Sequence, residues 1–213
     1  MPLSGSVVLI TGATGPVGRP IADAFCEAGA SVAFSVRRIE DVRPAEVSLR
    51  KDGKAPFIAP CDLRFEEDVV RLVHRVIRHF GRIDMLINAA MISGPTERIV
   101  DCHVDPWRKL IATNLTGSYL LCREVLPWML RQKRGCVALI HPAAAEASGA
   151  STLVTKEAVS ALVNQLTAEI RLPDVNLHAL PSPPPAKLDD SAWLASLLEL
   201  APRPAPSGPQ AVS

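Results

Sequence analysis

A glycine-rich segment between two regular elements constrains the fold of this chain more than any other feature. Val7–Ile10 is a short continuous apolar run, as expected for a strand that is buried on both faces. Residues 11–18 read Thr-Gly-Ala-Thr-Gly-Pro-Val-Gly, and Ile21–Ala28 then has the pattern of a helix that ends at Gly29. Glycines at such a place let backbone N–H groups and a helix N-terminus approach a phosphate. The segment therefore predicts a strand, a phosphate-binding turn and a helix; a tight turn without a ligand is the alternative.

Short apolar runs and helical patterns alternate along most of the remaining chain. Further strands are expected at Ser31–Val36, Ala55–Ala59, Asp84–Asn88, Cys136–Ile140 and Val175–Leu180. Helices are expected at Glu66–Phe80, Trp107–Gln132, Thr152–Leu172 and Asp190–Leu200, with a kink or break near Pro127 in the second of them. This alternation predicts an α/β fold, a Rossmann-like doubly wound parallel sheet in three αβα layers. We expect one domain over residues 1–200 and a Pro-rich C-terminal tail over residues 201–213.

Charge and cysteine usage exclude several classes of protein. A net charge of +1 gives no field that would attract nucleic acid or an anionic membrane. The basic run from Arg71 to His79 alternates with apolar residues, so we interpret it as the solvated face of a helix. No apolar stretch approaches the ~20 residues of a membrane span, and the N-terminus has no signal-peptide pattern. The five scattered cysteines favour reduced thiols over disulfides or a metal site, so we expect a cytoplasmic protein.

The turn and two later motifs resemble the short-chain dehydrogenase/reductase family over roughly residues 5–181. Most simple members carry Thr-Gly-x-x-x-Gly-x-Gly, whereas the Thr-Gly-x-x-Gly-x-x-Gly spacing here is similar to that of the extended and atypical branches. Cys61-Asp62-Leu63 matches the Asp-Val/Leu pair that lies beside adenine, and Asn88-Ala89-Ala90-Met91 resembles the Asn-Asn-Ala-Gly motif. The resemblance implies a cofactor site made by Gly12, Thr14, Gly15, Val17, Gly18, Arg37, Asp62, Leu63, Asn88, Ala89, Ala90 and Lys156.

The end of the second strand bears on which nicotinamide cofactor is used. Arg37 and Arg38 stand there, without a carboxylate that would bind a ribose 2′-hydroxyl. Arginine suits a 2′-phosphate, which favours NADP(H) over NAD(H). The alternative is that both arginines are simply solvated, in which case NAD(H), or no cofactor at all, remains open.

Half of the family's catalytic tetrad is missing. Asn114 and Lys156 match the family's Asn and Lys, but Thr152 stands at the tyrosine position and Pro142 at the serine position. The only tyrosine, Tyr119, cannot belong to a Tyr-x-x-x-Lys motif. His141 adjoins the serine position, and strand alternation is expected to turn it to the other face of the sheet. The region after Pro181-Ser182 resembles a truncated substrate region without a lid.

Three functions follow from this pattern. The first is a catalytically impaired NADP(H)-binding protein that acts as a non-catalytic subunit or partner of an active short-chain reductase. The second is an active NADP-dependent oxidoreductase of the ketoreductase type with unconventional acid/base residues, and the third is a nucleotide-sensing regulator. A homo- or hetero-oligomer with a homologue would form through the two long helices; the residues proposed for this contact are Leu110, Leu115, Leu121, Leu126, Val154, Ala158, Leu162 and Leu166. The alternative is that these faces belong only to the core.

Overall fold

The computed structural model describes residues 2–38, 40, 57–98, 100–142, 149–183, 187 and 190–202. The predicted residues 55 and 56 of the third strand and residues 203–213 of the proposed tail lie outside the described residues. Along the chain the elements are β1 (Val7–Thr11), α1 (Gly18–Glu27), β2 (Ser31–Val36), β3 (Phe57–Pro60), α3 (Glu66–Phe80), β4 (Met85–Asn88), α4 (Val104–Leu110), η2 (Ile111–Thr116), α5 (Gly117–Gln132), β5 (Gly135–His141), α6 (Ala150–Glu169), β6 (Val175–Pro181) and α7 (Ser191–Glu199).

All six strands form one parallel sheet in the order β3-β2-β1-β4-β5-β6. In this register Leu9 of β1 lies between Ala33 of β2 and Leu86 of β4. The order of the strands reverses between β1 and β4, which creates a crevice at their carboxyl ends. The expected doubly wound parallel sheet is therefore confirmed.

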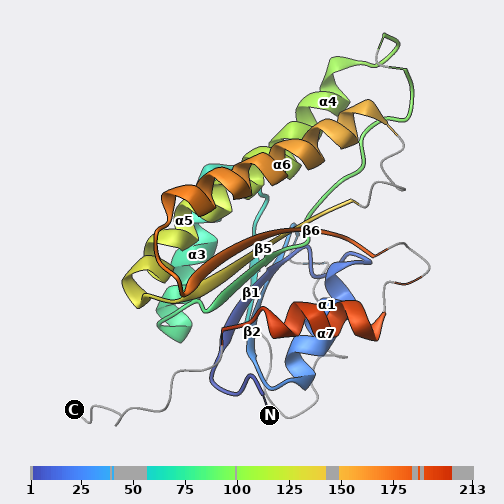
Figure 1. The fold of residues 1–213 in the computed structure, drawn as a ribbon. Helices are drawn as coiled ribbons and strands as arrows, with labels where there is room; N and C mark the ends of the chain where they lie inside the picture. The colour runs from blue at the N-terminus through green and yellow to red at the C-terminus, as the bar shows by residue number, and fades with distance from the viewer. Residues whose placement is uncertain are drawn as a thin grey trace, which may run out of the picture.

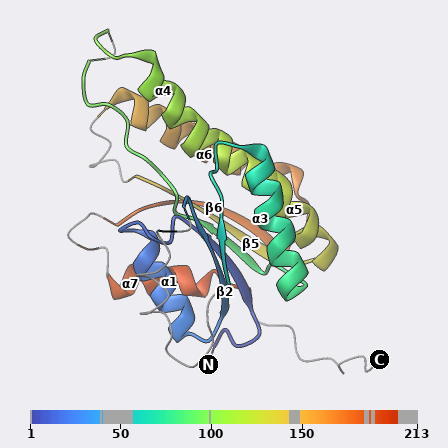
Figure 2. The ribbon, with the colours of Figure 1, turned by 180° about the vertical axis from the view of Figure 1, so that it is seen from behind.

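Helices cover both faces of the sheet (Figure 1, Figure 2). On one face α3, α5 and α6 pack over a core that includes Leu9, Leu86 and Val137. On the other face α1 and α7 cover a second core that includes Ile10 and Ala138. Because successive side chains of a strand point to opposite faces, each strand contributes to both cores, and the two layers are stabilised by the same sheet.

The long helical stretch before β5 is interrupted, but at a different place from the one expected. The helix α5 continues through Pro127 to Gln132, and the irregularity is the π-helical turn η2 at Ile111–Thr116. Pro127 is exposed on the outer side of α5, so the carbonyl group that its missing N–H leaves free can bind water. The break that was expected near Pro127 therefore does not occur.

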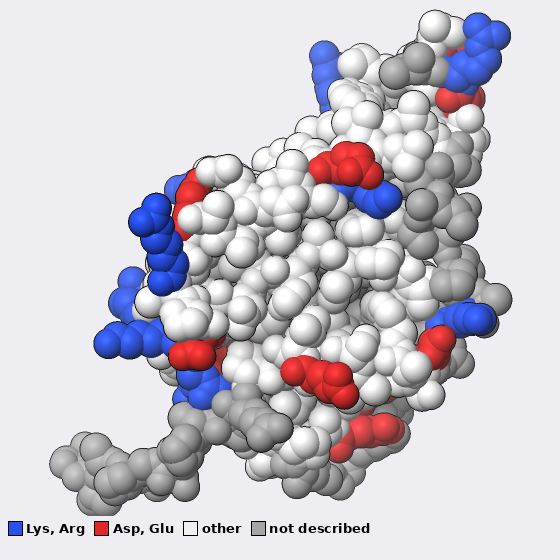
Figure 3. All heavy atoms as spheres, viewed as in Figure 1, with Lys and Arg blue, Asp and Glu red and all other residues white. Residues whose placement is uncertain are grey.

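Half of the leucines proposed for a helix contact are fully buried within this chain. Leu110, Leu121 and Leu126 are buried, and Leu115, Leu162 and Leu166 are partly buried against the same core. The exposed apolar side chains of these helices are Tyr119, Leu130, Leu153 and Val154. Few charged side chains lie over the middle of the face that α6 and β6 present (Figure 3). None of the helices within the described residues is long and apolar enough to cross a membrane.

Candidate functional site

A cavity of about 490 Å³ lies at the carboxyl ends of the central strands, where the strand order reverses. Its walls come from the turn after β1, the ends of β2 and β3, the segment after β4 and the beginning of the helical stretch before α5. The residues that line it are Gly12, Thr14, Gly15, Pro16, Val17, Ser35, Val36, Arg37, Cys61, Asp62, Leu63, Arg64, Ala89, Ala90, Met91, Ile92, Ser93, Lys109, Thr113, Pro142 and Ser182. Parallel α/β sheets bind ligands in such crevices.

The glycine-rich turn is shaped by two glycines that no larger residue could replace without displacement. Gly12 has a φ of +70°, and a Cβ there would lie 2.6 Å from the Ala90 nitrogen at the end of β4. A Cβ at Gly18 would overlap the Gly12 carbonyl group. The first turn of α1 therefore packs on the glycine-rich turn, and that turn packs on the segment after β4. The N-terminus of α1 lies beside the cavity, where anions are favoured.

Asp62 and Arg64 form a close ion pair at the β3 side of the cavity. Arg64 donates from Nε to Asp62 Oδ1 at 2.9 Å and from Nη2 to Oδ2 at 2.5 Å. The Arg64 backbone N–H donates to the same carboxylate at 3.1 Å. The hydrogen bond from the Arg64 side chain lowers the pKa of Asp62, and the charge of Arg37 lowers it further, against the opposing effect of burial.

Positive charge predominates among the charged residues of this cavity. The charged residues that line it are three cations, Arg37, Arg64 and Lys109, and one carboxylate, Asp62. Lys109 belongs to α4, and the following turns bring Gly117 against Leu63, so this helical stretch closes on the same side of the cavity as the Asp62–Arg64 pair. The neighbouring Cys61 thiol stays protonated, because burial raises its pKa to about 12. An anionic ligand is therefore favoured.

Asn88 fixes the end of β4 and does not line the main cavity. Its Oδ1 accepts hydrogen bonds from the Thr11 hydroxyl at 2.5 Å and from the Ala90 N–H at 3.2 Å. Its Nδ2 donates to the Ser118 hydroxyl at 2.9 Å, and that hydroxyl donates to the Asn114 carbonyl oxygen at 2.6 Å. This chain of bonds joins β1, β4 and the π-helical turn η2 into one unit.

A small adjoining cavity of about 10 Å³ is lined by three of the four positions that the resemblance assigns to the catalytic tetrad, Asn114, Pro142 and Lys156, but not by Thr152. Asn88, Asn114, His141, Pro142, Thr155 and Lys156 are among the residues that line it. The Asn114 side chain binds both backbone groups of Ile92, accepting from its N–H at 2.9 Å and donating to its carbonyl at 2.8 Å. The Lys156 ammonium lies 3.4 Å from the Glu157 carboxylate, which is exposed. Asn114 and Lys156 are thus brought together as the resemblance implied.

The hydroxyl of Thr152 is directed to a structural partner. Thr152 is 2% exposed, and its Oγ1 accepts a hydrogen bond from the Gly94 N–H at 2.9 Å. Pro142 lines both cavities but offers neither a hydroxyl nor an N–H. Tyr119 is 48% exposed on α5 and lines neither cavity. In the described part of the chain, no tyrosine lies at this site.

His141 does not lie where strand alternation was expected to place it. It is 7% exposed, and it lines the small cavity together with Asn114 and Lys156. Val137 and Leu139, which precede it at intervals of two residues, belong to the core under α5 and α6. His141 therefore lies on the same face of the sheet as Val137 and Leu139. This is the face that α6 covers, so His141 lies beside the site and not on the opposite face, as had been expected. Its Nδ1 lies 3.1 Å from the Pro142 carbonyl oxygen.

Most of the residues expected at the cofactor site do lie around one cavity. Gly12, Thr14, Gly15, Val17, Arg37, Asp62, Leu63, Ala89 and Ala90 line the main cavity, Gly18 supports it from behind, and Asn88 and Lys156 line the small one. Sequence reasoning missed Arg64 and Lys109. Arg64 directly follows the Asp62-Leu63 motif, a signal that was available, whereas Lys109 reaches the cavity only through the packing of α4.

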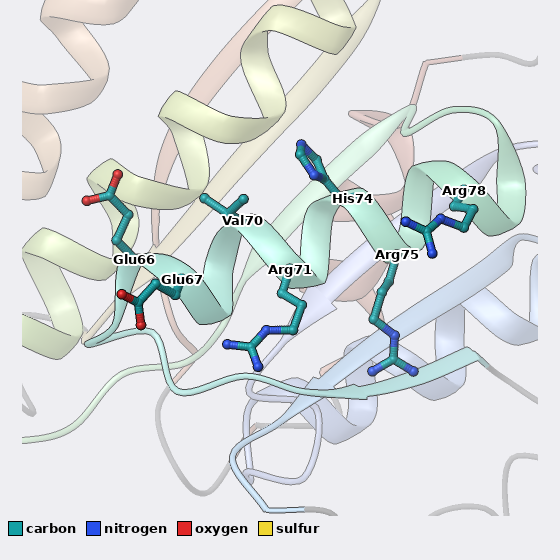
Figure 4. A pocket seen from close by; sticks show the side chains of 7 residues that line it. All are labelled: Glu66, Glu67, Val70, Arg71, His74, Arg75 and Arg78. Carbon is teal, nitrogen blue, oxygen red and sulfur yellow. The ribbon is translucent and has the colours of Figure 1, made fainter.

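A larger hollow of about 770 Å³ lies along the outside of α3 (Figure 4). Its residues all belong to that one helix: Glu66, Glu67, Val70, Arg71, His74, Arg75 and Arg78. The acidic residues lie at the beginning of α3 and the basic residues nearer its end, as a helix dipole favours. We interpret this hollow as a solvated helix face. No group of three His, Cys, Asp or Glu side chains suited to a metal ion occurs within the described residues.

The sequence is similar to a family model and to several curated proteins. Residues 6–184 match the family model of short chain dehydrogenases. L-fucose dehydrogenase of Oryctolagus cuniculus is 34% identical over 169 residues, which are 78% of this chain and 58% of that protein. Tropinone reductase-like 1 of Erythroxylum coca is 30% identical over 174 residues, 79% of this chain and 63% of that protein. This chain therefore spans less than two thirds of the length of these relatives.

Two solved structures have the same fold. A metagenomic short-chain oxidoreductase in complex with NADP superposes with a TM-score of 0.84 and 28% identity, covering 95% of this chain and 94% of the other. An NAD⁺-bound xylitol dehydrogenase superposes with a TM-score of 0.80 and 26% identity, covering 94% of this chain and 77% of the other. The two neighbours carry different nicotinamide cofactors.

Proposed function

Because the chain belongs to the short-chain dehydrogenase family, we propose that it binds NADP(H) in the main cavity without carrying out the family's reduction itself. In this proposal it serves as a non-catalytic subunit or partner of an active short-chain reductase. The cofactor would supply hydride chemistry when bound, whereas the residues of this chain hold the nucleotide and support a partner.

The hydrogen bond between Gly94 and Thr152 is the observation that carries this proposal. The family's reduction needs a group that transfers a proton to the substrate oxygen, and Thr152 stands at the position of that group. Its hydroxyl is buried, is held in place by the Gly94 N–H and lines neither cavity, and an aliphatic hydroxyl is a far weaker acid than a phenol. Pro142 offers no substitute. General acid–base catalysis is worth ~10²–10⁴ in rate, so its loss raises the barrier by roughly 3–5 kcal/mol.

The charges of the cavity support NADP(H) over NAD(H). Arg37 stands at the end of β2 without a neighbouring carboxylate on that strand, and Arg64 and Lys109 add two cations to the same cavity. A 2′-phosphate brings additional negative charge to this side, and charge-assisted hydrogen bonds from arginine to phosphate are strong. The glycine-rich turn and the N-terminus of α1 suit the pyrophosphate.

The outer faces of α5 and α6 support association with a second short-chain reductase subunit. Leu153 and Val154 are 41% and 47% exposed near the beginning of α6, and Tyr119 is comparably exposed on α5. The Lys156–Glu157 pair lies on α6 itself, but the surface between α6 and α7 carries few charges (Figure 3). Apolar surface of this kind gains free energy when a partner covers it.

Titration of the purified protein with NADP⁺ and NADPH, alongside a turnover assay with carbonyl substrates, tests the proposal. We expect binding of both forms and no oxidation of NADPH above background. NADPH oxidation that Lys156→Ala abolishes would contradict the non-catalytic role. Co-expression with an active homologue tests the partner role. Val154→Arg is expected to prevent assembly, and Val100→Arg, at a more exposed position outside these helices, is expected to leave it intact.

One observation favours the alternative of an active enzyme with an unconventional acid. His141 lies in the small cavity beside Asn114 and Lys156, and imidazole is suited to proton transfer near neutral pH. In that alternative, NADPH oxidation by the wild type falls by a factor of ~10² or more in His141→Gln. The non-catalytic proposal instead expects no turnover in either protein.

A further inference from the structure

The carboxylate of Asp62 is almost fully occupied by its neighbour Arg64. Oδ1 accepts from the Arg64 backbone N–H at 3.1 Å and from Nε at 2.9 Å, and Oδ2 accepts from Nη2 at 2.5 Å. Both residues line the main cavity. Asp62 therefore presents a neutralised ion pair to the cavity, and little free acceptor capacity remains for a ligand hydroxyl or amine.

Arg37 lies close enough to this pair for its charge to act on Asp62. It lines the same cavity, and its positive charge contributes to the lowered pKa of the Asp62 carboxyl. A phosphate that binds Arg37 must therefore also lie within the field of Asp62. If the carboxylate were bare, it would repel that phosphate and cancel part of the attraction of Arg37. The Arg64 guanidinium removes this repulsion.

The backbone around Asp62 is held independently of the Arg64 side chain. The Asp62 N–H donates to the Asp68 carboxylate at 3.0 Å, and the Phe65 N–H donates to the Asp62 carbonyl at 3.0 Å. The Arg64 side chain is 35% exposed and is not part of the apolar core under α3, α5 and α6. Removal of this side chain therefore exposes the carboxylate without dismantling the loop.

We propose that Arg64 determines the cofactor preference of this protein by neutralising Asp62, so that Arg37 can bind a 2′-phosphate. This inference rests on the proposed binding of NADP(H) and adds a residue that acts indirectly, through the carboxylate that it covers. Without Arg64, the bare Asp62 carboxylate repels a 2′-phosphate, and the preference moves toward NAD(H), which lacks that phosphate.

Calorimetric titration of NADP⁺ and NAD⁺ into matched variants tests this role. We expect Arg64→Ala to weaken NADP⁺ binding about tenfold or more and to leave NAD⁺ binding within about twofold of the wild type. In the double variant Asp62→Asn/Arg64→Ala, the loss for NADP⁺ is mostly recovered, because no bare carboxylate remains. Arg123→Ala is the control, since it removes an arginine that pairs with Glu66 at 2.7 Å outside the cavity.

The outcomes separate this inference from the proposed function. If Arg64→Ala weakens NADP⁺ and NAD⁺ equally, Arg64 only shapes the loop and the inference is wrong. If the double variant binds NADP⁺ as weakly as Arg64→Ala, Arg64 contacts the phosphate itself and neutralisation of Asp62 is not its role. If the wild type binds neither cofactor, the proposed function fails and this inference fails with it. Unfolding of each variant in urea checks that the fold is intact.

Discussion

Two side chains, Asn114 and Thr152, fasten the segment after β4 to the helices behind it. Asn114 binds both backbone groups of Ile92, and Thr152 accepts from the Gly94 N–H. A Cβ at Gly94 would overlap the Ser151 hydroxyl, so the segment packs tightly on the beginning of α6. The Asn114 and Thr152 side chains are thus part of the scaffold of the site.

The valine variant of Thr152 measures this structural role. Thr152→Val keeps the shape of the side chain but leaves the Gly94 N–H without its acceptor, so we expect the free energy of unfolding to fall by about 1–3 kcal/mol. Thr152→Ser retains the hydroxyl and serves as the control, with a smaller loss. Urea unfolding followed by circular dichroism gives both values. Equal stability of the wild type and Thr152→Val would show that water replaces the hydroxyl at no cost.

Asp84 has a similar structural role at the opposite edge of the sheet, where the strands begin. Its carboxylate is buried, accepts from the Val7 N–H at 2.9 Å, and pairs with Arg82 at 2.5 Å and with Arg134 at 3.5 Å. It therefore connects the beginnings of β1, β4 and β5. We expect Asp84→Asn to lower the free energy of unfolding by about 1.5–3 kcal/mol, because it removes the counter-charge of two partly buried arginines.

The matched control for Asp84→Asn is Asp105→Asn, which breaks an exposed pair with Arg108. Exposed pairs contribute about 0–1 kcal/mol, so this change is expected to be nearly neutral. Urea midpoints of the two variants give the comparison. A loss below about 1 kcal/mol for Asp84→Asn would mean that the ion pair is not what holds the three strands together.

At the scale of whole elements, the parallel sheet could be predicted from sequence, whereas the helix before β5 could not. Apolar runs such as Val7–Ile10 are determined by burial on both faces, which is visible locally. The π-helical turn η2 accompanies a contact between Asn114 and Ile92, which are 22 residues apart, and no local pattern indicates it. The break expected at Pro127 does not occur, and the exposure of Pro127 that allows this is visible only in the packed structure.

The same distinction applies to the candidate site. Residues of the glycine-rich turn were predictable, because a strand, a tight turn and a helix in succession leave no room for a side chain at Gly12 and Gly18. The contribution of Lys109 could not be predicted, since it depends on how α4 lies against the cavity. His141 was misplaced for a related reason: the strand alternation was known, but the helix that covers each face was not.

The strand β6 contributes to the pH dependence of stability through His178. This residue is partly buried, and burial lowers its pKa below the ordinary value of 6.5. The folded protein therefore binds the proton less readily than the unfolded chain. The contribution of neutral His178 to the free energy of unfolding is complete above about pH 6.5 and is lost as the pH falls below that value.

Comparison of His178→Asn with the wild type tests this prediction. We expect the wild type to lose stability between pH 7.5 and about pH 5.5 and the variant to lose less, with urea midpoints measured at each pH. His74→Asn is the control, because His74 is exposed on α3. If the pH dependence of His178→Asn equals that of the wild type, His178 does not titrate differently in the two states.

At the scale of the whole molecule, one sheet joins two separate apolar layers. Cys122 of α5 belongs to the layer under α3, α5 and α6, and Cys136 of β5 belongs to the layer under α1 and α7. Burial raises the pKa of both thiols to about 12. Because thiol reagents need the thiolate, neither cysteine reacts until the structure around it opens. The two thiols therefore report on the opening of the two layers independently.

We expect Cys122 and Cys136 to react at the same slow rate with a thiol reagent at pH 8, and with the same dependence on urea. Both layers depend on the strands between them, so neither opens without the other, and the rate follows global unfolding. Cys102, which is half-buried beside α4, provides the internal control and reacts early. Mass spectrometry of digested samples gives the rate at each cysteine. A faster reaction at Cys136 than at Cys122, with a weaker urea dependence, would mean that α1 and α7 detach from the sheet while α3, α5 and α6 remain packed.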